Sequence, residues 1–117
     1  MLFRSSDDDI ARMLTESFST AEQDMRERSL RESRVESERL LLATKSALRA
    51  DGDLLEEGER ETIEAAMATL QTTREGDDHA AIDAAVEALA ATTEAFAAER
   101  MNRGIRQALA GRRIEDV

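Results

Sequence analysis

The stretch GDDHAAIDAAVEALAATTEAFAAERMNRGIRQALAG, residues 76–111, decides the fold class of this chain. Apolar and small residues recur in it every three or four positions, which is the period of an α-helix. The positions in this row are Ile82, Ala85, Val86, Leu89, Thr93, Phe96, Ala97, Met101, Ile105 and Leu109. No proline interrupts the row, and we expect Gly76 to end the preceding helix and Asp77 to cap the next one. The stretch predicts a long helix over about residues 78–110.

The composition of the whole chain favours the same class. Its 117 residues suffice for one modest domain, and they include no proline, 3% aromatic and 36% charged residues. Strong helix formers dominate, and the core has to be built from Leu, Ile, Val, Met and Ala. These facts predict an all-α fold.

Three further helices are expected over about residues 7–18, 19–50 and 56–75. They follow a lead-in at residues 1–6, in which Ser6 is a suitable N-cap. Most residues between Arg26 and Arg39 are charged or serine, which predicts a solvated helical arm rather than a core element. Asp51-Gly52-Asp53 is expected to form the turn after the arm.

Short connections between helices indicate antiparallel neighbours. We therefore expect residues 40–48, 63–70 and 82–89 to form an antiparallel three-helix bundle, with the first helix packed near the long arm. Two apolar rows outrun this bundle, and large unpartnered faces indicate a missing domain or a partner chain. The rows are Ile10, Met13, Leu14 and Phe18 in the first helix and Phe96, Met101, Ile105 and Leu109 in the last. The last row has three possible partners: the arm, Leu30 with Val35, or another chain.

The chain offers little chemistry of its own. Its net charge of −10 disfavours nucleic acid and anionic membranes, because phosphate-binding faces need clustered Lys and Arg. Cysteine is absent and His79 is the only histidine, so no zinc or nucleophile–base set is predicted. Asp51-Gly52-Asp53 lacks the other ligands of a calcium loop. We expect no catalytic, cofactor or metal site, and a cytoplasmic location.

Several stretches resemble, in order, the helical lid of the DnaK-type (Hsp70) heat-shock chaperones. They are residues 8–13, 34–41, 51–55 and 76–82. Residues 96–101 and 105–111 are similar to the branch of this family that serves iron–sulfur cluster assembly, and residues 114–117 resemble the natural C-terminus of that branch. The resemblance covers residues 7–117. The lead-in departs from the family pattern, and whether it is native is left open.

The resemblance implies a function. A full-length protein of this family would couple an ATPase domain, which binds ATP, to a β-sandwich that grips an extended peptide of an unfolded client, and the lid would close over that peptide. In the iron–sulfur branch the client is the scaffold protein on which clusters are assembled, and a J-type cochaperone stimulates ATP hydrolysis. This chain corresponds to the lid alone, so we expect it neither to hydrolyse ATP nor to hold a client groove.

The resemblance also implies candidate site residues. In such lids an acidic residue, and a histidine one turn later, latch onto the sandwich. These positions fall on Glu38 and Leu42, and the missing histidine predicts a weaker or differently built latch. The row of Ile10, Met13, Leu14 and Phe18 would rest on the sandwich. Each assignment has an alternative. Glu38 could be an ordinary surface charge paired with Arg34, and the row from Ile10 to Phe18 could belong to the core of the bundle.

A second interpretation remains open from the sequence: a standalone acidic helical bundle that binds or dimerises through its first and last rows. An enzyme is disfavoured, because the chain has no nucleophile–base or metal-ligand set. Under either interpretation the uncovered face from Ile10 to Phe18 is expected to make the isolated chain self-associate.

Overall fold

The structure is a computed structural model that describes the backbone of residues 2–115 and the side chains of residues 7–112. Helix α1 spans Leu2–Asp51, the short 3-10 helix η1 spans Gly52–Leu54, α2 spans Glu57–Thr73 and α3 spans His79–Glu115. No strand occurs among the described residues. The predicted all-α class is confirmed.

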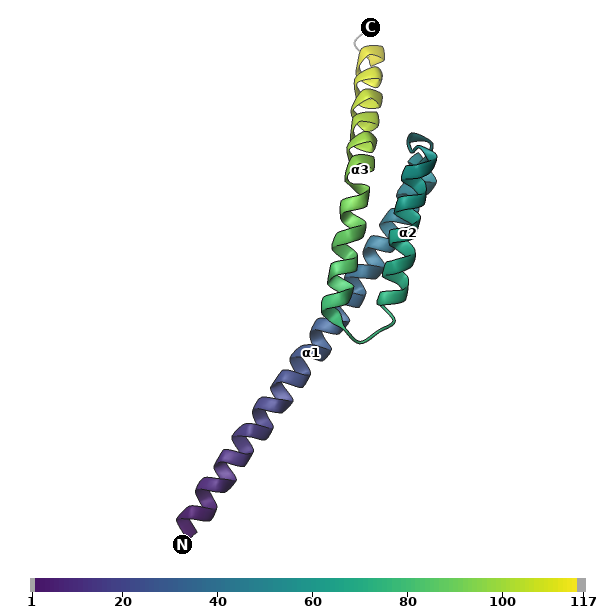
Figure 1. The fold of residues 1–117 in the computed structure, drawn as a ribbon. Helices are drawn as coiled ribbons and strands as arrows, with labels where there is room; N and C mark the ends of the chain where they lie inside the picture. The colour runs from purple at the N-terminus through teal and green to yellow at the C-terminus, as the bar shows by residue number, and fades with distance from the viewer. Residues whose placement is uncertain (1, 116–117) are drawn as a thin grey trace.

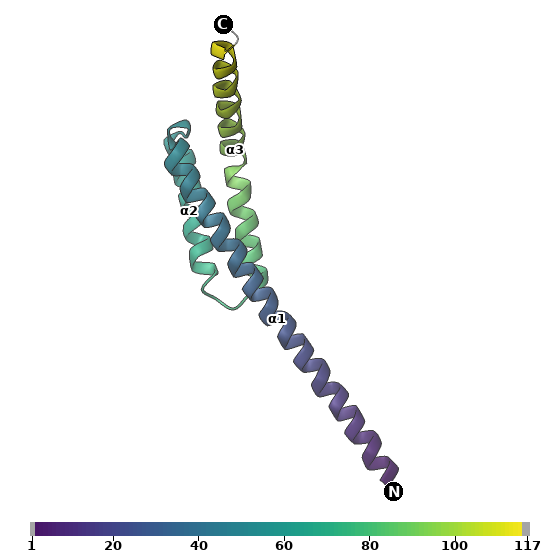
Figure 2. The same ribbon diagram turned by 180° about the vertical axis from the view of Figure 1, so that it is seen from behind.

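The molecule is long and thin, with extents of 93 × 35 × 16 Å. The second half of α1, all of α2 and the first half of α3 lie side by side, with α2 running opposite to the other two (Figures 1 and 2). The first half of α1 projects from one end of this bundle. The last turns of α3 project beyond the other end (Figure 1). The bundle therefore has two uncovered helical extensions that point in opposite directions.

One hydrophobic core holds the three helices together. It contains residues from all three, and Phe96 joins it because α3 stays against α1 at that position. The buried apolar side chains are Leu41, Ala47, Ile63, Met67, Leu70, Ile82, Ala85, Leu89 and Phe96. Leu54 and Leu55 pack against this core from the loop after α1. The predicted three-helix bundle is confirmed.

The first helix does not pack near the arm; it continues it. α1 runs without a break through Phe18 and Ser19, where a boundary between two helices was expected. No Gly or Pro lies near these residues, so each added residue extends the hydrogen-bond ladder. Residues 7–28 are exposed throughout, so this segment lies on no other part of the chain.

The second half of the predicted arm packs in the bundle through small polar residues that are buried. Ser33, Ser37 and Thr44 are 6%, 0% and 5% exposed on the side of α1 that faces its neighbours. The Ser37 hydroxyl donates to the Ser33 carbonyl over 2.6 Å, and the Ser33 hydroxyl donates to Asp83 on α3 over 2.6 Å. Counting apolar residues misses this face, because its contacts are made by small hydroxyl side chains. The solvated part of α1 therefore ends near residue 28, not near residue 39 as expected.

The helix ends also differ from the predictions. α2 ends at Thr73, and no described glycine has a positive φ, so Gly76 is not a left-handed helix terminator. Asp78, not Asp77, caps α3: its carboxylate accepts from the amides of Ala80 and Ala81 over 3.0 and 3.3 Å. α3 also continues past Gly111 to Glu115, since one exposed glycine costs only about 1 kcal/mol. The lead-in at residues 1–6 and the C-terminus at residues 113–117 lie outside the residues whose side chains are described. The predictions for these two ends therefore stay predictions.

Candidate functional site

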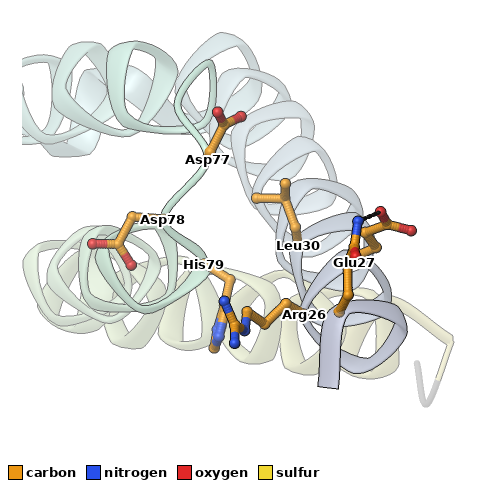
Figure 3. A pocket seen from close by; sticks show the side chains of 7 residues that line it. Arg26, Glu27, Leu30, Asp77, Asp78 and His79 are labelled. Atoms are coloured by element: carbon orange, nitrogen blue, oxygen red, sulfur yellow. Dashed lines mark hydrogen bonds between the residues drawn. The ribbon is translucent and has the colours of Figure 1, made fainter. Parts of the chain in front are cut away.

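A crevice marks the point where α1 leaves the bundle. Figure 3 looks into it, with Arg26, Glu27 and Leu30 on the α1 side and the loop before α3 on the other. Its space is about 690 Å³, and its lining also includes Gln23, Asp77, Asp78 and His79. Charges of both signs surround one apolar side chain, so the crevice does not select an anion or a cation. It separates the packed part of α1 from the exposed part.

Arg34 fastens α1 to the turn between α2 and α3. Its guanidinium donates to the carbonyls of Arg74 and Gly76 over 3.2 and 2.9 Å, and lies 3.4 Å from a carboxylate oxygen of Asp77. The last carbonyls of a helix have no partner within the helix. Arg34 therefore supplies hydrogen-bond donors to carbonyls at the end of α2 and in the turn after it. The same contacts fix where α1 crosses α2.

Glu38, the candidate latch, lies one turn after Arg34 and does not pair with it in the structure. Its carboxylate is 3.8 Å from Arg74 of α2, and the Glu38 side chain is 60% exposed. Leu42, at the position where the family has histidine, is 59% exposed. Both side chains thus stand on an accessible part of the bundle surface. The alternative of an Arg34–Glu38 pair is replaced by an Arg74–Glu38 pair.

The candidate packing row lies on the projecting arm. Ile10, Met13, Leu14 and Phe18 are 51%, 59%, 67% and 67% exposed. Their alternative, burial in the core of this bundle, is excluded by these values. Phe18 and Glu38 are twenty residues apart on one helix, which is roughly 30 Å. The structure therefore does not bring the candidate latch and the candidate packing row together.

The Asp51-Gly52-Asp53 turn has a role that the sequence did not reveal. Asp51 accepts from Arg100 over 2.8 Å and from Arg103 over 3.0 Å, and both oxygens of Asp53 accept from Arg103. These hydrogen bonds hold the pKa of Asp51 and of Asp53 below the ordinary value of 3.8 and raise the pKa of Arg103. We call this set the acidic clamp; it ties the end of α1 to α3.

The sequence shows the two sides of the acidic clamp but not the contact between them. Arg100 and Arg103 are spaced by three residues, which places them on the same side of a helix. The Arg100 guanidinium also lies 5.9 Å from the ring centre of Phe96. The acidic turn and the arginine pair are about fifty residues apart in the sequence. Their contact could be predicted only if the bundle topology were already known.

The described residues carry neither a cluster of metal ligands nor a helix that could span a membrane. No three His, Asp or Glu side chains among them gather closely enough to hold a metal ion. Within residues 2–115, no helix combines the length and apolar composition of a membrane span. The candidate surfaces of the described chain are therefore the exposed row, the neighbourhood of Glu38 and the end of α3.

Comparison with known proteins identifies the family. Residues 3–102 match the family model described as Hsp70 protein. The chain is 67% identical over 112 residues to the "Chaperone protein HscA homolog" of Methylibium petroleiphilum, which covers 96% of the chain and 18% of that relative. It is 64% identical over 110 residues to the protein of the same name from Verminephrobacter eiseniae, covering 94% of the chain and 18% of that relative. The chain thus spans only a small part of the curated relatives it matches, and the resemblance seen in its sequence is confirmed: the chain belongs to the Hsp70 family.

Proposed function

We propose that this chain is the helical lid of a longer, HscA-like chaperone of the Hsp70 family. In that protein the lid closes over a peptide-binding β-sandwich of the same chain. The observation that carries the proposal is the exposed apolar row of α1, whose members are Ile10, Met13, Leu14 and Phe18. A large exposed apolar face on a protein is a surface for another partner. The relatives are long enough to supply one, since the chain covers 18% of them.

The bundle and the projecting arm have separate tasks under this proposal. The bundle is rigid because Leu70, Ile82 and Leu89 are fully buried between its helices. The arm carries the row that rests on the sandwich, and each large apolar side chain that it buries there stabilises the closed lid by about 1.5–3 kcal/mol. Because α1 is continuous from the arm into the bundle, closing the arm moves the whole bundle with it.

Glu38 is the residue through which the closed lid latches onto the sandwich. Its carboxylate is more than half exposed and its present partner, Arg74, is 3.8 Å away. An exposed ion pair of this length contributes little, about 0–1 kcal/mol. Glu38 can therefore exchange Arg74 for a donor on the sandwich at small cost. Leu42 supplies no hydrogen bond beside it, so this latch is weaker than one with histidine.

The similarity to proteins named HscA homolog supports a more specific task. The full-length chaperone binds a segment of the iron–sulfur scaffold protein, hydrolyses ATP in its ATPase domain, responds to a J-type cochaperone and works in the cytoplasm. The lid itself takes no part in ATP hydrolysis. It sets how long the scaffold segment stays bound.

The test is the rate at which a fluorescent client peptide leaves the full-length chaperone. Replacing Ile10 and Phe18 by alanine removes apolar contact from the closed lid, so release should accelerate by about tenfold or more. The matched control is Met101→Ala, since Met101 is equally exposed at 69% but lies on the other extension. Unchanged release in the Ile10→Ala, Phe18→Ala protein would overturn the proposal.

The latch is tested separately. Glu38→Ala should accelerate release by less than the row variants, roughly two- to fivefold. Glu36→Ala is its control, because Glu36 is an exposed acid two residues away on the same helix. If Glu38→Ala leaves release unchanged while the row variants accelerate it, the latch idea fails and the lid proposal stands.

A further inference from the structure

Glu38 lies on α1 between the side that packs in the bundle and the side that carries the exposed row. An α-helix turns about 100° per residue, so the row from Ile10 to Phe18 points about 140° away from the mean direction of the buried side chains of α1. Glu38 lies about 100° from the row and about 120° from those buried side chains. Its carboxylate can therefore turn toward the row side or toward a neighbouring helix. The buried side chains of α1 are Ser33, Ser37, Leu41, Thr44 and Ala47.

In the structure Glu38 turns toward the end of α2. Its carboxylate lies 3.8 Å from the guanidinium of Arg74, the residue that follows α2. The backbone of Arg74 is held independently of this pair. Its amide donates to the Leu70 carbonyl over 2.9 Å, and its own carbonyl accepts from Arg34 over 3.2 Å. Arg74 is thus a cation fixed beside Glu38 by the bundle itself, whether or not a sandwich is present.

A cation fixed at this place lowers the attraction of Glu38 for any other donor. The charge of Arg74 partly neutralises the carboxylate, and it repels a second cation that approaches the same carboxylate. Exposed ion pairs are individually weak, so two partners of Glu38 compete on nearly equal terms. The presence of Arg74 therefore decides part of the strength of any contact that Glu38 makes outside the bundle.

Arg74 also has somewhere to go when Glu38 leaves it. Its side chain is 32% exposed and lines a surface hollow of about 620 Å³ together with Arg34, Gln71 and Glu75. Water and the carboxylate of Glu75 are available to the guanidinium there. Separating the pair consequently strands no buried charge, and the exchange of partners is reversible.

We propose that Arg74 competes with the sandwich for Glu38 and thereby keeps the latch weak. In the open lid Glu38 pairs with Arg74, and closing the lid exchanges this pair for the contact with the sandwich. This inference rests on the proposed function, because it takes Glu38 as the latch. Residue 74 then tunes client release from the end of α2, outside the helix that carries the latch.

Release of a fluorescent client peptide from the full-length chaperone tests the competition. Arg74→Gln removes the cation and keeps a long side chain, so release should slow by about twofold or more. Arg74→Lys keeps the charge and should release the peptide at nearly the unchanged rate. Arg60→Gln is the matched control, since Arg60 forms an exposed pair of the same 3.8 Å length with Glu64 at the other end of α2. It should leave release unchanged.

The same substitution in a Glu38→Ala background completes the test. Arg74→Gln should have no effect there, because no carboxylate is left to compete for. Far-UV circular dichroism checks that each variant is folded. Faster release in Arg74→Gln would show that Arg74 positions Glu38 for the sandwich. Unchanged release, or slowing that persists with Glu38→Ala, would show that there is no competition; each of these results overturns the proposal.

The outcome can be separated from that of the proposed function. If Glu38→Ala alone leaves release unchanged, the latch and the competition by Arg74 fail together. The lid function is decided by the variants at Ile10 and Phe18, which touch neither Glu38 nor Arg74. It therefore stands or falls independently of this inference.

Discussion

The two halves of α1 carry the same kind of pattern and have opposite surroundings. Both place apolar side chains at helical spacing, yet Leu41 is 3% exposed and Phe18 is 67% exposed. The second half has α2 and α3 beside it, and the first half has nothing (Figure 1). Periodicity therefore predicts that a helix has an apolar face, but the presence of a partner decides whether that face is buried. The following predictions test this difference.

The largest difference is expected in stability. Leu89→Ala removes a fully buried side chain and leaves a cavity, so it should lower the free energy of unfolding by about 3–5 kcal/mol. Phe18→Ala removes a side chain that touches no other element and should change it by less than about 0.5 kcal/mol. Urea denaturation followed by circular dichroism measures both. A comparable loss in the two variants would mean that the arm is packed in solution.

A smaller effect is expected where the packed half is fastened. Arg34→Ala leaves the carbonyls of Arg74 and Gly76 without their side-chain donor and should cost about 1–2 kcal/mol. Arg31→Ala is the control, since Arg31 is an exposed arginine of the same helix. If urea denaturation gave the same loss of unfolding free energy for Arg34→Ala and Arg31→Ala, the hydrogen bonds of Arg34 would contribute nothing specific to stability.

The acidic clamp predicts a dependence on pH. Because hydrogen bonds to arginine lower the folded-state pKa of Asp51 and Asp53, their contribution to stability is present above the unfolded pKa and is lost as pH falls through the lower folded pKa. Arg103→Gln should therefore lower the Tm at pH 7, and the difference from the unchanged chain should shrink below about pH 3.8. Arg106→Gln, on the same helix, should leave the Tm unchanged at both pH values. A deficit of the Arg103 variant that grows in acid would contradict this account.

The smallest effect concerns association through the arm. The isolated chain should self-associate weakly at high concentration through the row from Ile10 to Phe18. Phe18→Glu should shift its sedimentation toward the monomer, and Thr20→Glu, which adds the same charge beside the row, should not. If the unchanged chain sedimented only as a monomer at high concentration, self-association through the row from Ile10 to Phe18 would be contradicted.

Much of the fold was predictable from the chain. The row from Ile82 to Leu89 identified one wall of the bundle, and Ile82, Ala85 and Leu89 are buried in its core. Strong periodicity with no proline allows few alternatives to helices. The exposed row on α1 was also recognised as lacking a partner, and its exposure bears this out.

The remaining features depend on contacts between distant residues. Ser33 and Ser37 are polar in any hydropathy scale, and only the nearness of α3 makes them interior residues. The acidic clamp joins Asp51 to Arg103 across fifty-two residues. Phe96 was expected to outrun the bundle together with Met101, Ile105 and Leu109, but it is 2% exposed in the core while the other three are more than half exposed. The latch role of Glu38 stays a prediction.

The most direct test of the two-part lid is hydrogen exchange of α1, measured on the isolated chain and on the full-length chaperone with a bound client peptide. In the isolated chain, amides of residues 33–48 should exchange slowly and those of residues 10–18 quickly, because only the first group lies in the packed bundle. In the full-length chaperone residues 10–18 should become protected by at least about tenfold as the sandwich covers them. Residues 10–18 that exchange as quickly there as in the isolated chain would contradict the account.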